Sequence, residues 1–125
     1  MIHRWYVTSD WKSGEHFGGL NNKTEALDRI CNEFVYLQRS VISRIEVIRG
    51  NYQILTLTKS CPNVPCDKAF NIVCNGKRFM LQECRTGYYL TEENERGIVS
   101  VSIGIYSSLR KVINYLITEH KEKNV

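Results

Sequence analysis

Proline is scarce in this sequence, and long apolar runs are absent. Only 2 of the 125 residues are proline, while 42% are apolar and 24% are charged, which excludes a disordered or low-complexity chain. The longest stretch without a charge, residues 97–109, is shorter than the about 20 residues of a membrane-spanning helix. The first residues also lack the apolar core of a signal peptide. We therefore expect one soluble, cytoplasmic domain over residues 1–125.

The sequence motifs of common enzyme classes are also missing. There is no phosphate-binding G-x-x-x-x-G-K-[ST], no dinucleotide-binding G-x-G-x-x-G, no G-x-S-x-G and no H-E-x-x-H. The glycines of residues 14–19 come several residues before the first expected helix, whereas a phosphate cradle places them at the helix start. We predict that the protein is not an enzyme and needs no cofactor, and we read residues 10–19 as a loop.

Five cysteines are present, and their spacing does not indicate a metal site. Structural zinc sites usually contain paired C-x2-C units. The last four cysteines follow the spacing C-x4-C-x7-C-x9-C, and these are Cys61, Cys66, Cys74 and Cys84. We predict free thiols and no metal, with zinc binding and disulfides as the less favoured alternatives.

Two amphipathic helices are predicted. Asn22 stands three residues before Glu25, a capping-box spacing, and apolar residues follow at helical intervals from Leu27 to Leu37. The first helix is therefore expected over residues 23–39. A second apolar stripe follows Ser107, a good N-cap, and predicts a helix over residues 108–120. Residues 121–125 are expected to fray.

Between the helices the apolar period changes to two, which indicates strands. Gly50-Asn51 and Asn75-Gly76 are two-residue hairpin signals. They join strands over residues 41–49 and 52–59, and over 70–74 and 77–84. Further strands are expected over 3–9 and 98–105, and residues 87–91 form either another strand or the continuation of the one before. The predicted fold class is α+β, a single domain with an antiparallel sheet of five or six strands and two helices packed on it.

The hairpin signals also set the predicted pairing. In the second hairpin, Ile72 should pair with Phe79 and Phe70 with Leu81. In the first, Val47 should pair with Ile54 and Ile48 with Gln53, with apolar residues on both faces, so we expect it near the middle of the sheet and at least partly covered on both sides. The predicted core comprises Leu27, Ile30, Phe34, Ile72, Phe79, Leu81, Val101, Ile103, Val112, Ile113 and Leu116.

Aromatic and arginine side chains gather in two segments and are the candidate binding residues. The set is Trp11, Arg78, Arg85 and Tyr88. Such side chains are frequent hot spots of protein interfaces, and they also stack on bases and pair with phosphates. Trp11 is expected in the glycine-bearing loop and partly exposed, and replacing Trp11 and Arg85 should leave stability almost unchanged. The competing interpretation is that some of the aromatic residues simply belong to the core.

Two classes of function remain. The net charge of +4 is spread evenly along the chain, which permits nucleic-acid binding without demanding it. The scarcity of alanine, with 2 residues against 12 isoleucines and 10 asparagines, resembles an AT-rich coding source such as a phage or mobile element. We predict a non-enzymatic accessory protein that captures and inhibits a host protein, including a defence factor. The alternative is a binder of a nucleotide or single-stranded nucleic acid. A homodimer is also expected, through Val73, Met80 and a sheet edge.

Overall fold

A computed structural model describes residues 4–11, 14–20, 22–59, 69–93 and 99–119. It contains one antiparallel sheet of eight strands in the order β2-β1-β3-β4-β5-β6-β7-β8, and two helices. The elements are β1 (Trp5–Trp11), β2 (Gly14–Leu20), α1 (Lys23–Gln38), β3 (Arg44–Arg49), β4 (Tyr52–Lys59), β5 (Ala69–Cys74), β6 (Lys77–Cys84), β7 (Gly87–Glu93), β8 (Val99–Tyr106) and α2 (Leu109–Glu119). The α+β class is confirmed, and the predicted number of strands is too low.

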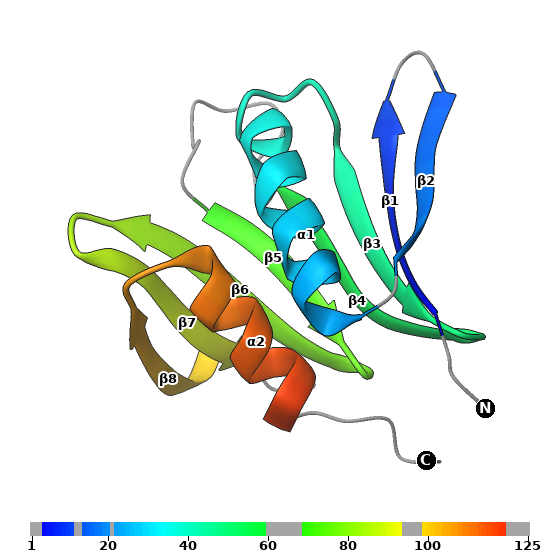
Figure 1. Ribbon diagram of the computed structural model, residues 1–125. Coiled ribbons are helices and arrows are strands. Elements are labelled where there is room, and N and C mark those ends of the chain that lie inside the picture. The colour runs from blue at the N-terminus through cyan, green and yellow to red at the C-terminus, as the bar shows by residue number, and fades with distance from the viewer. Residues whose placement is uncertain (1–3, 12–13, 21, 60–68, 94–98, 120–125) are drawn as a thin grey trace.

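Both helices lie against the same face of the sheet (Figure 1). We call this the inner face and the opposite one the outer face. The core lies between the helices and the inner face, where strand residues alternate between buried and more exposed. Phe34 on α1, for example, packs on Phe70 of β5 with 4.7 Å between ring centroids. None of the helices in the described part of the chain is long and apolar enough to cross a membrane.

The helices follow their predicted signals closely. The side chain of Asn22 accepts a hydrogen bond from the backbone N–H of Glu25 at 2.9 Å and caps α1. At α2 the cap is Ser108, whose hydroxyl accepts from the backbone N–H of Lys111 at 3.3 Å. The predicted cap, Ser107, is therefore one residue too early. The expected fraying of residues 121–125 falls outside the described residues.

The second hairpin has the predicted register, and the first does not. Ile72 pairs with Phe79 and Phe70 with Leu81 across β5 and β6. In β3 and β4, Ile48 pairs with Gln53 as expected, but Val47 pairs with Leu55 because a bulge inserts Ile54. Every pair beyond the bulge is shifted by one residue. The hairpin does lie near the middle of the sheet, but only its inner face is covered, by α1 (Figure 1).

The missed strand is β2, in the segment that we predicted to be a loop. Its backbone pairs with β1 from Trp5↔Leu20 to Trp11↔Gly14. Three of its seven residues are glycine, and glycine is rare in strands, so composition pointed the wrong way. The segment forms a strand in spite of its composition, because it pairs with β1, which is itself paired with β3 on its other side.

The predicted core is largely confirmed. Buried positions include Leu27, Ile30, Phe34, Ile72, Phe79, Leu81, Val112, Ile113 and Leu116. Ile103 is only half-buried, and the side chain of Val101 lies outside the described residues. The reason lies in β8, where register shifts against β7 break the alternation that we expected. Beyond them, Ile105 faces outward with 61% of its surface exposed.

Candidate partner-binding surface

Exposed apolar side chains concentrate at the C-terminal end of α1. Of the six large apolar side chains that are exposed in the described part of the chain, Val35, Tyr36 and Val41 lie within seven positions of one another. The backbone N–H of Val41 donates to the carbonyl of Tyr36 at 2.9 Å, which folds the chain back against the last helical turn. Together with Trp11, these residues form what we call the α1-end patch.

Trp11 is the aromatic anchor of this patch. As the last residue of β1, it follows Trp5, Val7 and Ser9 on the inner face, where alternate residues point towards the helices. Its ring packs edge-on against Tyr36, with 4.6 Å between centroids. Its indole N–H donates to the carboxylate of Glu33 at 3.2 Å. The indole is half-buried and held in place, which limits the side-chain entropy that a partner must remove on binding.

Asp10, the neighbour of Trp11, ties the end of β1 to the connection after α1. Its carboxylate accepts hydrogen bonds from the backbone N–H groups of Ser43 and Arg44, each at 2.9 Å, and from the Ser43 hydroxyl. Partial burial acts to raise the pKa of Asp10, but these hydrogen bonds outweigh it and the pKa is lowered. The carboxylate therefore holds the segment that follows Val41 beside Trp11.

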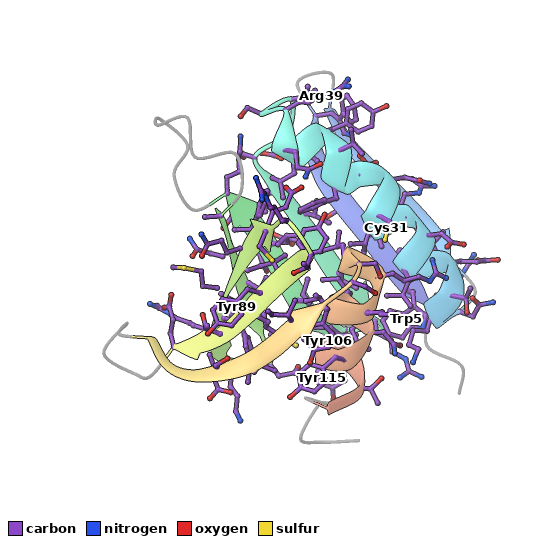
Figure 2. All side chains as sticks on the ribbon, turned by 90° about the vertical axis from the view of Figure 1, so that its left-hand side faces the viewer. Trp5, Cys31, Arg39, Tyr89, Tyr106 and Tyr115 are labelled. Carbon is purple, nitrogen blue, oxygen red and sulfur yellow. The ribbon has the colours of Figure 1, made fainter. Side chains whose placement is uncertain are left out.

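Cationic groups surround the last turn of α1. The Lys59 ammonium donates to the carbonyl of Gln38 at 2.9 Å and to the hydroxyl of Ser40 at 2.8 Å. A cation at this place stabilises the negative end of the helix. Arg39 is exposed at the end of α1 (Figure 2) and forms no ion pair with a described residue. The patch therefore has a basic border on its helix side.

The four predicted binding residues do not form one site. Tyr88 is half-buried on the inner face, 6.2 Å from the ring of Phe34, and burial together with the Glu83 carboxylate raises its pKa. Arg85 is exposed in the turn between β6 and β7, at the same end of the sheet as Trp11 but on the other side of α1. Arg78 is exposed near the opposite end of β6.

The interpretation of Trp11 as a loop residue is wrong, because it ends a strand and packs against the core. Its partial exposure agrees with the prediction. The patch residues Val35, Tyr36 and Val41 were missed altogether. For Trp11, the period-two pattern from Trp5 was a usable signal. For Tyr36, a position off the apolar stripe of a predicted helix was the only hint.

The remaining candidate features give weaker indications of a binding or metal site. Arg78 borders a shallow depression of about 270 Å³, lined also by Asn71, Val73 and Glu93 together with the strands beneath them. Cys31, Cys74 and Cys84 are free thiols, while Cys61 and Cys66 lie outside the described residues. Within the described ranges, no three His, Cys, Asp or Glu side chains gather as metal ligands would. The absence of a metal therefore stays a prediction.

Comparison with known proteins adds no relative. No protein-family model matches the chain, and neither a curated protein nor a solved structure does. We therefore infer the function from the geometry of the α1-end patch.

Proposed function

We propose that this protein is a non-enzymatic binding module that captures a second protein through the α1-end patch. The observation that carries the proposal is the gathering of Val35, Tyr36 and Val41, which are 43%, 38% and 38% exposed, at the C-terminal end of α1, where Tyr36 packs on a fixed tryptophan. Exposed apolar patches mark interaction sites on soluble proteins. Tryptophan and tyrosine are also the residues that most often contribute large binding energies.

The charges around the patch favour a partner that is apolar and acidic. The carboxylates of Asp10, Glu33 and Glu83 already accept hydrogen bonds from this chain. Arg39, at the end of α1, is exposed and has no ion-pair partner among the described residues. A partner segment that places aliphatic or aromatic groups on the patch and carboxylates on its rim would satisfy both features.

A host factor remains the proposed partner, and inhibition by capture the proposed outcome. This part of the proposal is supported by the alanine-poor composition, which is typical of AT-rich phages and mobile elements, and by the lack of catalytic motifs. A protein that inhibits by occupying a surface needs a preorganised contact area and no turnover chemistry. The α1-end patch supplies such an area.

The alternative proposal, binding of a nucleotide or single-stranded nucleic acid, has weaker support. Such sites combine stacked aromatic groups and cations along one groove. In the described part of the chain, Trp11 and Arg78 lie at opposite ends of the sheet, and α1 stands between Trp11 and Tyr88.

Selection from a displayed peptide library on the immobilised protein would test the protein-binding proposal. We expect the selected peptides to combine aliphatic or aromatic residues with Asp or Glu. The double variant Val35→Glu/Val41→Glu should weaken binding of a purified selected peptide at least about thirtyfold, or about 2 kcal/mol. Tyr52→Glu is the matched control, because Tyr52 is 44% exposed and lies on β4, outside the patch.

The controls make the outcome decisive. Equal losses in the patch variant and in Tyr52→Glu would contradict the proposed site, as would selected peptides that bind the patch variant unchanged. A single-stranded oligonucleotide that binds tightly, with an affinity that falls steeply with salt, would favour the alternative. An assay of host interference with the same variants then tests whether capture inhibits a host factor.

A further inference from the structure

The two edges of the sheet differ in a way that bears on assembly. An edge strand presents unpaired backbone N–H and C=O groups, and proteins usually protect such edges with charged residues, proline or bulges. One edge, β2, contains Glu15 and three glycines. The other edge, β8, has the sequence VSVSIGIY, with no charged residue and no proline. Its register shifts against β7 are the only protective feature on this list that β8 shows.

The C-terminal part of β8 is both regular and exposed. From Gly104 to Tyr106 it pairs without interruption with β7. Tyr106 faces α2, with its ring 5.7 Å from that of Tyr115 (Figure 2). Ile105 points the opposite way and has 61% of its surface exposed, the most of any large apolar side chain that the structure describes. Its cross-strand neighbour Tyr89 is half-buried.

From these features we propose that two copies of this chain pair β8 to β8, in antiparallel orientation, and form one continuous sheet. A two-fold axis places each residue of β8 opposite a residue of β8 in the other copy. Any charged residue in this strand would therefore lie near the same charge of the partner. Like charges in opposed positions destabilise a sheet. β8 carries no charged residue, whereas the sequence of β2 includes a glutamate, Glu15. The edge that lacks charge is thus suited to a second copy of itself.

Dimerisation through β8 is separate from partner capture. The α1-end patch borders β1, and five strands separate β1 from β8 in the sheet order. Pairing of β8 therefore leaves the patch open in both copies, and failure of either proposal leaves the other standing.

Sedimentation equilibrium over a concentration series would test the dimer. We expect the wild type to associate as a dimer and Ile105→Lys to raise the dissociation constant at least about tenfold, because it places two ammonium groups at the shared edge. Val73→Lys is the matched control. Val73 is 43% exposed but belongs to β5, in the middle of the sheet, so its variant should dimerise like the wild type. At concentrations where the wild type is monomeric, both variants should melt like the wild type, since both sites are exposed in the monomer.

Hydrogen exchange supplies an independent measurement on the unmodified protein. Amides of residues 102–106 should exchange more slowly as the protein concentration rises, and those of β2 should not change. A wild type that stays monomeric at millimolar concentration would overturn the proposal. Dissociation by Val73→Lys rather than by Ile105→Lys would also overturn it, because it would indicate packing of the outer faces instead of pairing of the edges.

Discussion

Both faces of the sheet carry apolar residues, but these residues have different roles on the two faces. In β5 and β6, the inner face carries Phe70, Ile72, Phe79 and Leu81, all within 1% of complete burial. The outer face of the same strands carries Val73, which is 43% exposed, and the half-buried Met80. The difference comes from the helices, which cover one face only (Figure 1). An apolar residue in this sheet therefore contributes to stability according to its face, more than according to its type.

Adjacent residues of β6 give the strongest test of this difference. Phe79→Ala should lower the free energy of unfolding by about 3 to 5 kcal/mol, because it opens a cavity in a core that encloses the ring. Met80→Ala removes a half-buried side chain from the outer face and should cost about 1 kcal/mol or less. Urea unfolding of both variants measures the contrast. Equal losses would show that the two faces are equally packed.

Trp11 lies at the rim of the inner face, so its replacement should have an intermediate effect. Trp11→Phe removes the indole N–H that Glu33 accepts, and Glu33 is only 6% exposed. A buried acceptor that loses a donor costs about 1 to 3 kcal/mol. This revises our sequence-based expectation that replacing Trp11 is silent for stability.

A double-mutant cycle separates this hydrogen bond from packing. Adding Glu33→Leu to Trp11→Phe removes the acceptor as well, and should restore part of the lost stability. Strictly additive losses would mean that the contact between Trp11 and Glu33 contributes nothing beyond packing.

Replacing Asp10 probes the outer face of β1 at the same end of the strand. Asp10→Asn should cost about 1 kcal/mol at neutral pH, since an amide accepts the Ser43 and Arg44 hydrogen bonds less strongly than a carboxylate. The pKa of Asp10 is lowered in the folded state from 3.8, so its contribution is present above that pH and is lost as the pH falls. The stability difference between wild type and variant should therefore shrink on acidification. A constant difference between neutral and acidic pH would contradict this account.

Of these variants, Cys74→Ala should change the free energy of unfolding least at neutral pH. Burial on the inner face raises the pKa of the Cys74 thiol from 9.0 to about 11. The unfolded chain therefore releases this proton before the folded chain does, and the contribution of the neutral thiol is lost as the pH rises from about 9 to about 11. The free-energy difference between wild type and Cys74→Ala should narrow over that range in urea unfolding. A difference that widens instead would show that the thiolate is stabilised in the folded protein.

Local signals were sufficient where a turn and an apolar pattern agree. Asn75 and Gly76 both adopt positive φ angles, 49° and 82°, and the Asn-Gly pair that prefers this geometry fixed the register of β5 and β6. The cap and the stripe of α1 worked for the same reason. In β3 and β4 the turn was correct, but the bulge at Ile54 shifted the remaining pairs. No local sequence rule that we applied predicts a bulge at that residue.

The candidate site was harder to predict because distant segments build it. Trp11 meets Glu33 and Tyr36 only because β1 lies beside α1 in the folded sheet. The exposure of Tyr36 likewise depends on where the helix ends and how the chain turns after it. From the sequence we predicted Trp11 as a contact residue, but the sequence could not show which side chains surround it.

The order of the strands has a consequence for how the molecule assembles itself. From β3 to β8, every strand pairs with the next one along the chain, whereas β1 and β3 are separated by β2 and α1. Closing a long loop costs more entropy than closing a short one, so sequence-local pairings tend to form first. We expect β5 and β6 to gain protection early in pulse-labelled refolding, and the β1 amides that pair with β3 late. Trp11 would then reach its native position only in the last folding step. A partner that recognises the α1-end patch would therefore bind the fully folded protein and not its folding intermediates.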